Sequence, residues 1–104
     1  MQGGQYLVSG NVQYALVMQS DGNLVLYSGK SPLWASGTND NPGAYLGLQS
    51  DGNIVIYSSS GKALWVTNTS GKSLADLVLQ SDGNVVAYTT SGSAIWATNT
   101  NGEI

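Results

Sequence analysis

The sequence predicts an all-β protein built from three internal repeats, because one motif recurs three times between segments of strand-like composition. The motif begins Gln-Ser-Asp-Gly-Asn, ends in tyrosine, and occupies residues 19–27, 49–57 and 80–88. A leucine or isoleucine followed by tryptophan comes after each copy, at Trp34, Trp65 and Trp96, which are 31 residues apart in each step. The units fill nearly the whole chain, so we expect residues 1–104 to form a single domain.

Each Ser-Asp-Gly sequence lies between two segments that are rich in β-branched and aliphatic residues, as β-strands are. The segments after it are 24–27, 54–57 and 85–88. We interpret Ser-Asp-Gly as a three-residue hairpin loop, a type I turn followed by a glycine in the left-handed region. A two-residue Asp-Gly turn is the alternative. In the three-residue loop, the Gln and Asn of the motif face each other across the two strands.

Alternation of side chains along the strands predicts one polar and one apolar face in each unit. The polar face carries the Gln, Asn, Val and Tyr of the motif, which are the same in all three copies. The apolar face varies among aliphatic residues, as buried positions can when volume is roughly kept. Its members are Leu16, Met18, Leu24 and Leu26, then Leu46, Leu48, Ile54 and Ile56, then Leu77, Leu79, Val85 and Ala87. Because the polar face is the invariant one, we interpret it as a ligand-binding face.

The side chains of the motif match the hydroxyl groups of a sugar, each of which can donate and accept a hydrogen bond. A carboxylate, two amides and a phenol supply the polar groups, and the valine supplies a small apolar patch. The candidate sugar-binding residues are Gln19, Asp21, Asn23, Val25 and Tyr27, then Gln49, Asp51, Asn53, Val55 and Tyr57, then Gln80, Asp82, Asn84, Val86 and Tyr88. About four hydrogen bonds of about 1 kcal/mol each give roughly millimolar affinity, so three sites would act together through avidity.

The composition excludes several other functions. The chain has no histidine, cysteine or arginine and a net charge of −3, which argues against a zinc site, imidazole or thiol catalysis, and nucleic acid binding. One carboxylate in each motif is too few for a calcium site or for a glycosidase, so we expect no enzyme activity, no metal and no cofactor. The apolar runs are too short for membrane insertion. Residues 1–4 do not begin a signal peptide, and a chain without cysteine suits a secreted or a cytoplasmic location.

The spacing Gln-x-Asp-x-Asn-x-Val-x-Tyr resembles the motif of the monocot mannose-binding lectins, the snowdrop-type or bulb-type family. All five positions are intact in all three units, and the resemblance covers nearly the whole chain. It implies a β-prism II fold, with three antiparallel sheets around a pseudo-threefold axis. It also implies mannose-containing glycans and glycoproteins as partners. In that family Asp and Asn reach the 2-hydroxyl of mannose, Gln the 3-hydroxyl and Tyr the 4-hydroxyl, while Val packs on the ring carbons.

Two features depart from that family. Many plant members have a cysteine between the Asp and Asn of one motif, where this chain has Gly22 and no cysteine at all. The first unit also lacks a preceding tryptophan strand, since the position 31 residues before Trp34 is Gly3. We expect the Trp96 strand to fill this gap, within the chain or by C-terminal strand exchange with a partner, and we therefore predict a homodimer.

Other interpretations of the same residues remain. In the alternative, the chain is a non-catalytic protein-interaction or scaffold module with degenerate sugar sites, and Asp and Asn only stabilise the hairpin loops. The tryptophans could stack on sugars, but their fixed place in each unit favours a shared core. The Thr-Asn pairs at 38–39, 67–68 and 98–99 are interpreted as turns.

Overall fold

The computed structural model describes residues 3–10, 13–49, 51–71 and 74–100. These residues contain ten β-strands and no helix, which confirms the all-β prediction. The strands are β1 (Tyr6–Val8), β2 (Tyr14–Met18), β3 (Leu24–Ser28), β4 (Ser31–Ala35), β5 (Tyr45–Leu48), β6 (Ile54–Tyr57), β7 (Ala63–Val66), β8 (Leu74–Leu79), β9 (Val85–Thr89) and β10 (Ala94–Ala97). Over these ranges the protein has no long apolar helix of the kind that could cross a membrane.

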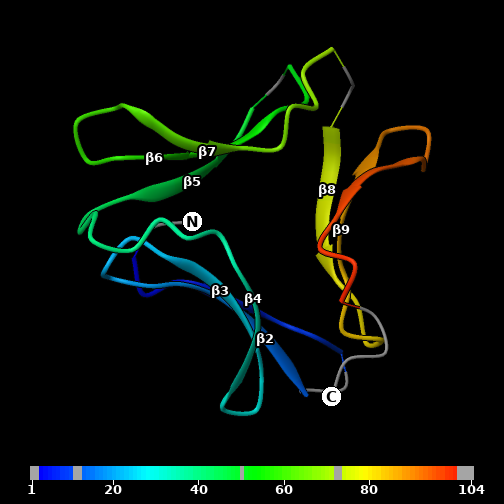
Figure 1. Ribbon diagram of the computed structural model, residues 1–104. Helices are drawn as coiled ribbons and strands as arrows, with labels where there is room; N and C mark the ends of the chain where they lie inside the picture. Colours follow the sequence, from blue (N-terminus) through cyan, green and yellow to red (C-terminus); the bar gives the residue numbers. More distant parts are fainter. Residues whose placement is uncertain (1–2, 11–12, 50, 72–73, 101–104) are drawn as a thin grey trace.

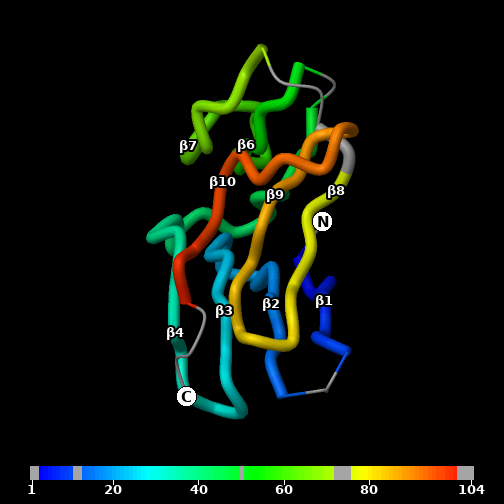
Figure 2. Tube along the Cα trace, turned by 90° about the vertical axis from the view of Figure 1, so that its right-hand side faces the viewer, coloured from blue at the N-terminus to red at the C-terminus, as the bar shows by residue number. Residues whose placement is uncertain are grey.

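The strands form three antiparallel sheets that enclose a common centre (Figure 1). Their strand orders are β1-β2-β3-β4, β5-β6-β7 and β8-β9-β10. In each sheet the motif spans the hairpin of two neighbouring strands, and the tryptophan strand lies on the outer side of the second. Figure 2, turned by 90°, shows β8 and β9 of the third unit in front of β2 and β3 of the first, and β2 and β8 are in contact. The three repeats of the sequence are thus three equivalent sheets, as the resemblance implied.

The loop of each motif has three residues, which confirms the first of the two interpretations. In the first unit the last strand pair is Met18 and Leu24, and the amide of Gln19 then donates to the carbonyl of Asn23 at 2.8 Å. The amide of Gly22 donates back to the carbonyl of Gln19 at 3.0 Å, and its φ is 94°. A Cβ at this glycine would lie 2.2 Å from the carbonyl oxygen of Asn41, so both the backbone conformation and the space require glycine.

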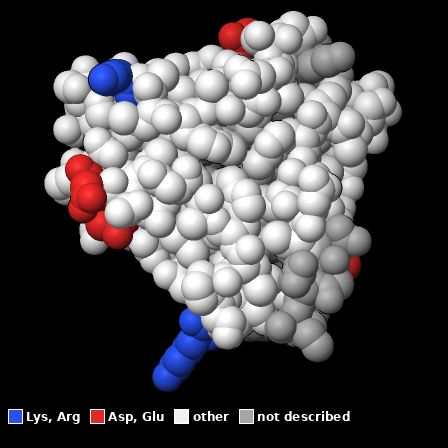
Figure 3. All heavy atoms as spheres, in the orientation of Figure 1, with Lys and Arg blue, Asp and Glu red and all other residues white. Residues whose placement is uncertain are grey.

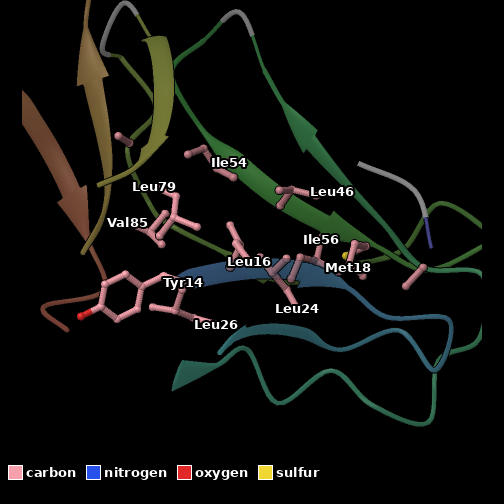
Figure 4. Close-up of a cluster of buried hydrophobic side chains, with 12 residues drawn as sticks. Tyr14, Leu16, Met18, Leu24, Leu26, Leu46, Ile54, Ile56, Leu79 and Val85 are labelled. Carbon is pink, nitrogen blue, oxygen red and sulfur yellow. The ribbon is translucent and has the colours of Figure 1, made fainter. Parts of the chain in front are cut away.

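The apolar faces of the three sheets point toward the centre and form one core (Figure 4). A bulge in the tryptophan strand lets two consecutive residues, such as Leu33 and Trp34, both pack against this core. The three indoles meet edge to face. The centroids of Trp34 and Trp65 are 5.6 Å apart with an interplanar angle of 73°, those of Trp34 and Trp96 are 5.7 Å apart at 74°, and those of Trp65 and Trp96 are 5.5 Å apart at 78°. Only about 10 Å³ of space remains between them and the surrounding aliphatic side chains. The prediction that the tryptophans form a core is therefore confirmed.

The prediction of a buried core position is wrong for one residue, Leu48. Leu48 of β5 is 45% exposed, whereas Met18 at the same place in β2 is fully buried. The amide of Gly4 donates to the carbonyl of Met18 at 2.7 Å, and the amide of Met18 donates to the carbonyl of Gln5 at 3.0 Å. Residues 4–5 therefore cover the edge of β2 beside Met18. Leu79, at the same place in β8, is only 8% exposed although β8 also lacks a strand on its outer side among the described residues, so the open edge of β5 does not by itself explain the exposure of Leu48.

The expected gap in the first unit does not exist. Trp96 lies opposite Ala87 of β9, so β10 completes the sheet of its own unit, as β4 and β7 complete theirs. The first sheet gains β1 instead, whose Leu7 pairs with Leu16 on the side of β2 away from the motif strand. No preceding tryptophan strand is needed, because each sheet uses the one that follows its own motif.

Candidate functional site

The five motif residues of each unit come together on the outer face of its hairpin. Gln and Asn flank the loop, Asp lies within it, and Val and Tyr follow on the next strand. The three Asp residues are exposed, and the Gln, Asn and Tyr residues are partly buried. The structure thus gathers all fifteen predicted residues into three equivalent clusters, five in each.

The aspartate is fixed through one of its two oxygens. In the first unit Oδ1 of Asp21 accepts a hydrogen bond from the backbone amide of Asn23 at 2.9 Å, and the other two units repeat it at 2.9 and 3.0 Å. This bond sets the orientation of the carboxylate within the loop. Within the described ranges, Oδ2 of Asp21 has no protein partner, so it is available to accept from a ligand.

The asparagine is fixed through its oxygen. Oδ1 of Asn23 accepts from the hydroxyl of Ser36 at 3.1 Å and from the amides of Gly37 and Thr38 at 3.0 and 3.2 Å. Thr67 and Thr69 bind Asn53 in the same way, and Thr98 and Thr100 bind Asn84. Since Oδ1 takes all these contacts, Nδ2 points its two donors away from them, and no described residue accepts from it.

A pair of hydroxyls behind each loop was missed by the sequence analysis. Ser36 joins Thr38 at 2.8 Å, and Thr38 donates to the carbonyl of Gly22 at 2.6 Å. The same pairs recur as Thr67 with Thr69 and as Thr98 with Thr100, each ending on a motif glycine at 2.6 Å. Thr38 is therefore equivalent to Thr69 and Thr100, and not to Thr67 and Thr98 as the Thr-Asn pairing suggested. The signal in the sequence is Ser/Thr-x-Thr directly after each tryptophan strand.

The glutamine and tyrosine of each motif are bonded to each other across the hairpin. Nε2 of Gln19 donates to the phenol oxygen of Tyr27, and Gln49 and Gln80 do the same to Tyr57 and Tyr88. Because the phenol oxygen accepts here, its own proton is left to donate outward. The amide oxygen of the glutamine is likewise left to accept from a ligand.

The valine is more deeply placed than the sequence suggested. Val25, Val55 and Val86 are only 3–4% exposed, although they lie on the polar face and outside the central core. In the first sheet Val25 lies between Val17 and Ala35 on the neighbouring strands. The valine is thus the floor beneath the four polar side chains and not an open apolar patch.

Each cluster can exchange hydrogen bonds with an uncharged, hydroxyl-rich ligand. It offers acceptors on Asp and Gln and donors on Asn and Tyr, all held by bonds to the protein. No three acidic side chains in the described part of the chain are grouped as a metal site would need. The face seen in Figure 3 is mostly uncharged, with its few charged side chains near the rim. These properties suit a neutral ligand better than a charged one.

Comparisons with known proteins find matches among solved structures. No protein-family model matches the chain, and no curated protein sequence matches it. A monomeric monocot mannose-binding lectin from Gastrodia elata shares 46% identity, with 97% of this chain and 91% of that chain covered and a TM-score of 0.88. Polygonatum cyrtonema lectin, complexed with monomannoside, shares 43% identity over 96% of this chain and 89% of its own, with a TM-score of 0.78. The mannose-specific agglutinin of snowdrop (Galanthus nivalis), complexed with methyl-α-D-mannoside, shares 38% identity over 97% and 90%, with a TM-score of 0.76.

Proposed function

The chain belongs to the monocot mannose-binding lectin family, and from that premise we propose that its three motif clusters bind mannose residues of glycans without a metal ion. It is a carbohydrate-binding lectin of the β-prism II type and not an enzyme. We treat residues 1–104 as one lectin domain of three repeats. Mannose-containing glycans and glycoproteins are its proposed partners.

One observation carries the proposal: the Asp, Asn and Gln of each motif use one polar atom to hold their position and keep another for a ligand. Asp51 is held by Oδ1, Asn53 by Oδ1 and Gln49 by Nε2, which leaves an acceptor, a donor and an acceptor facing outward. Such groups need little reorganisation when a sugar binds, and this lowers the entropic cost of association. The same arrangement in all three units supports three sites of one specificity.

The roles of the residues follow from which atoms stay available. The free oxygen of Asp21 can accept the proton of one hydroxyl while Nδ2 of Asn23 donates to its oxygen, and we assign this pair to the axial 2-hydroxyl of mannose. We assign the amide oxygen of Gln19 to the 3-hydroxyl and the phenol of Tyr27 to the 4-hydroxyl. We place Val25 under the ring carbons, where its small exposed surface makes an apolar contact.

Avidity compensates for weak single sites. The molecule measures 35 × 33 × 17 Å, and its sites lie on three different sheets around the axis. Each site is expected to bind a monosaccharide at about millimolar concentration. A branched or densely displayed glycan could engage more than one site, which multiplies the effective affinity.

The homodimer with strand exchange remains a prediction, and two facts bear on it. The β10 strand completes its own sheet within one chain, so exchange is not needed to build the fold. The related Gastrodia elata lectin is described as monomeric. Both facts favour a single chain, whose three sites already provide multivalency.

The scaffold alternative has one observation in its favour. Oδ1 of Asp21 and Oδ1 of Asn23 both stabilise the hairpin, so these residues have a structural use without any sugar. That use does not account for the glutamine and tyrosine, which bond mainly to each other and recur unchanged. Sugar binding explains all four residues.

Calorimetric titration with methyl α-mannoside tests the proposal, with methyl α-glucoside and a metal chelator as controls. We expect weak binding near three sites per chain, selective for mannoside and unchanged by chelator. Absence of heat with either sugar at high protein concentration would contradict the proposal and favour the scaffold alternative.

A further inference from the structure

The three clusters differ at one position on the strand that precedes each motif. The residue opposite the motif tyrosine is Ala15 for Tyr27, Tyr45 for Tyr57 and Asp76 for Tyr88. Directly opposed residues of antiparallel strands project on the same face of the sheet. The three clusters share the same five residues, but the residue beside the motif tyrosine is an alanine in the first, a tyrosine in the second and an aspartate in the third.

Tyr45 extends the second cluster with another aromatic ring. Its centroid lies 5.6 Å from that of Tyr57, with an interplanar angle of 31°, and its side chain is 38% exposed. Gly47, two residues further along β5, stands where the other units have Val17 and Val78. A Cβ there would lie 3.7 Å from the ring of Tyr57, at ordinary van der Waals distance, so the ring packs directly over this glycine. The two rings form a continuous aromatic surface that the other clusters lack.

Beside Tyr45 lies an open groove of about 320 Å³. It is lined by Tyr45, Gly3, Gly43 and Ser20, the last of which belongs to the hairpin loop of the first unit. Two of these four residues have no side chain, which keeps the groove open, while the serine hydroxyl adds a polar group. A groove lined by an aromatic ring and a hydroxyl suits a pyranose ring, which has an apolar C–H face and polar edges.

We propose that Tyr45 and this groove form a subsite for a second pyranose ring, linked to the mannose bound at residues 49–57. The inference rests on the proposed function, because the first ring must be held by the motif. The C–H face of the second ring stacks on Tyr45, and Ser20 meets its hydroxyls. Since the second ring arrives tethered to the first, it costs little further translational entropy. The second site therefore selects disaccharides and longer glycans, whereas the other two sites bind a terminal mannose.

The test isolates the second site within the complete chain. Asp21→Asn and Asp82→Asn together disable the other two sites, and each asparagine keeps an Oδ1 for the loop hydrogen bond while replacing the free acceptor with a donor. In this background Tyr45→Ala removes the ring, and Ala15 at the same place in the first unit shows that alanine suits the fold. Tyr45→Phe is the matched control, because it keeps the ring. Amide NMR spectra of each variant verify that it is folded.

The ligands are methyl α-mannoside and the methyl glycosides of α1,2-, α1,3- and α1,6-linked mannobiose. We expect at least one mannobiose to bind the isolated second site about fivefold more tightly than the monosaccharide, beyond the roughly twofold advantage of carrying two mannoses. Tyr45→Ala should abolish this preference and leave monosaccharide affinity within about twofold, while Tyr45→Phe should retain it. A preference that is absent, or that survives Tyr45→Ala, overturns the subsite while leaving mannose binding intact. Failure of the unmutated chain to bind methyl α-mannoside overturns the proposed function and the subsite together.

Discussion

Thr69 donates a hydrogen bond of 2.6 Å to the carbonyl oxygen of Gly52, the glycine at the turn of the second motif. The threonine is buried, and its amide also donates to Oδ1 of Asn53 at 3.2 Å. Thr69, which follows the tryptophan strand β7, thus holds both the backbone of the loop and a side chain of the proposed sugar site. Stability and binding are therefore connected in each unit.

Replacement of Thr69 by valine should destabilise the protein by about 1–3 kcal/mol, because it leaves the carbonyl of Gly52 buried without its partner. Urea unfolding followed by circular dichroism measures the change. Thr90→Val is the matched control, since Thr90 is exposed and has no hydrogen bond among the described residues; it should alter stability by no more than about 0.5 kcal/mol. Equal effects of the two substitutions would mean that the hydroxyl behind the loop adds nothing.

Asp51→Asn should weaken mannoside binding at the second site by about tenfold or more, because the charged acceptor becomes a donor. The asparagine oxygen can still accept from the amide of residue 53, so unfolding in urea should change little. NMR titration resolves the loss at one site from binding at the other two. Asp76→Asn, which removes a carboxylate outside the motif, is the control. Undiminished binding after Asp51→Asn would show that the carboxylate does not contribute to mannoside binding.

Tyr88→Phe should weaken binding at the third site by about fivefold, through loss of the donor proposed for the 4-hydroxyl. It also removes the acceptor for Nε2 of Gln80. NMR titration of the third site measures the affinity. Tyr6→Phe, at an exposed tyrosine of β1, serves as the control and should have no effect. Unchanged affinity in Tyr88→Phe would show that the phenol hydroxyl has only a structural role.

Saturation with methyl α-mannoside should leave the wavelength of tryptophan emission unchanged. All three indoles pack against one another in the core, on the opposite face of each sheet from the proposed sites. Fluorescence titration at concentrations that saturate the sites checks this. A shift that follows the binding curve would mean that an indole contacts the sugar, as the rejected platform interpretation requires.

Sedimentation velocity should give the mass of one chain, because β10 already pairs within its own sheet. This expectation opposes the homodimer predicted from the sequence, whose ground was a gap that the fold does not contain. A mass of two chains that persists on dilution would support the predicted homodimer. Strand exchange could then be tested by a disulfide engineered between β9 and β10, which would join two chains only if the strand is exchanged.

The loops, the core tryptophans and the composition of the clusters could be predicted because each signal is local and occurs three times. The loop Gln19–Asn23 closes through contacts within five residues, and turn chemistry alone specifies it. The tryptophans share one position in every unit, which is what a common axis requires. Repetition within the chain made a short motif informative.

Other features depend on neighbours that a local pattern does not reveal. The β1 strand is a single short run without a counterpart in the described residues of the other units, and its pairing with β2 was not predicted. The exposure of Leu48 could not be predicted from the repeats, because Met18 and Leu79 at the same place in the other two units are buried. The hydroxyl of Ser36 lies 13 residues from the asparagine that it supports, so only the folded sheet brings them together.

The divided use of each asparagine has a consequence for how these sites would decay under mutation. Since Asn84 holds the turn through Oδ1, a copy released from selection for sugar would still be selected to keep its asparagine. The glutamine and tyrosine, which mainly hold each other, would be lost first. A repeat that retains Asn but has lost Gln and Tyr is therefore the expected mark of an abandoned site, and in this chain no copy carries it.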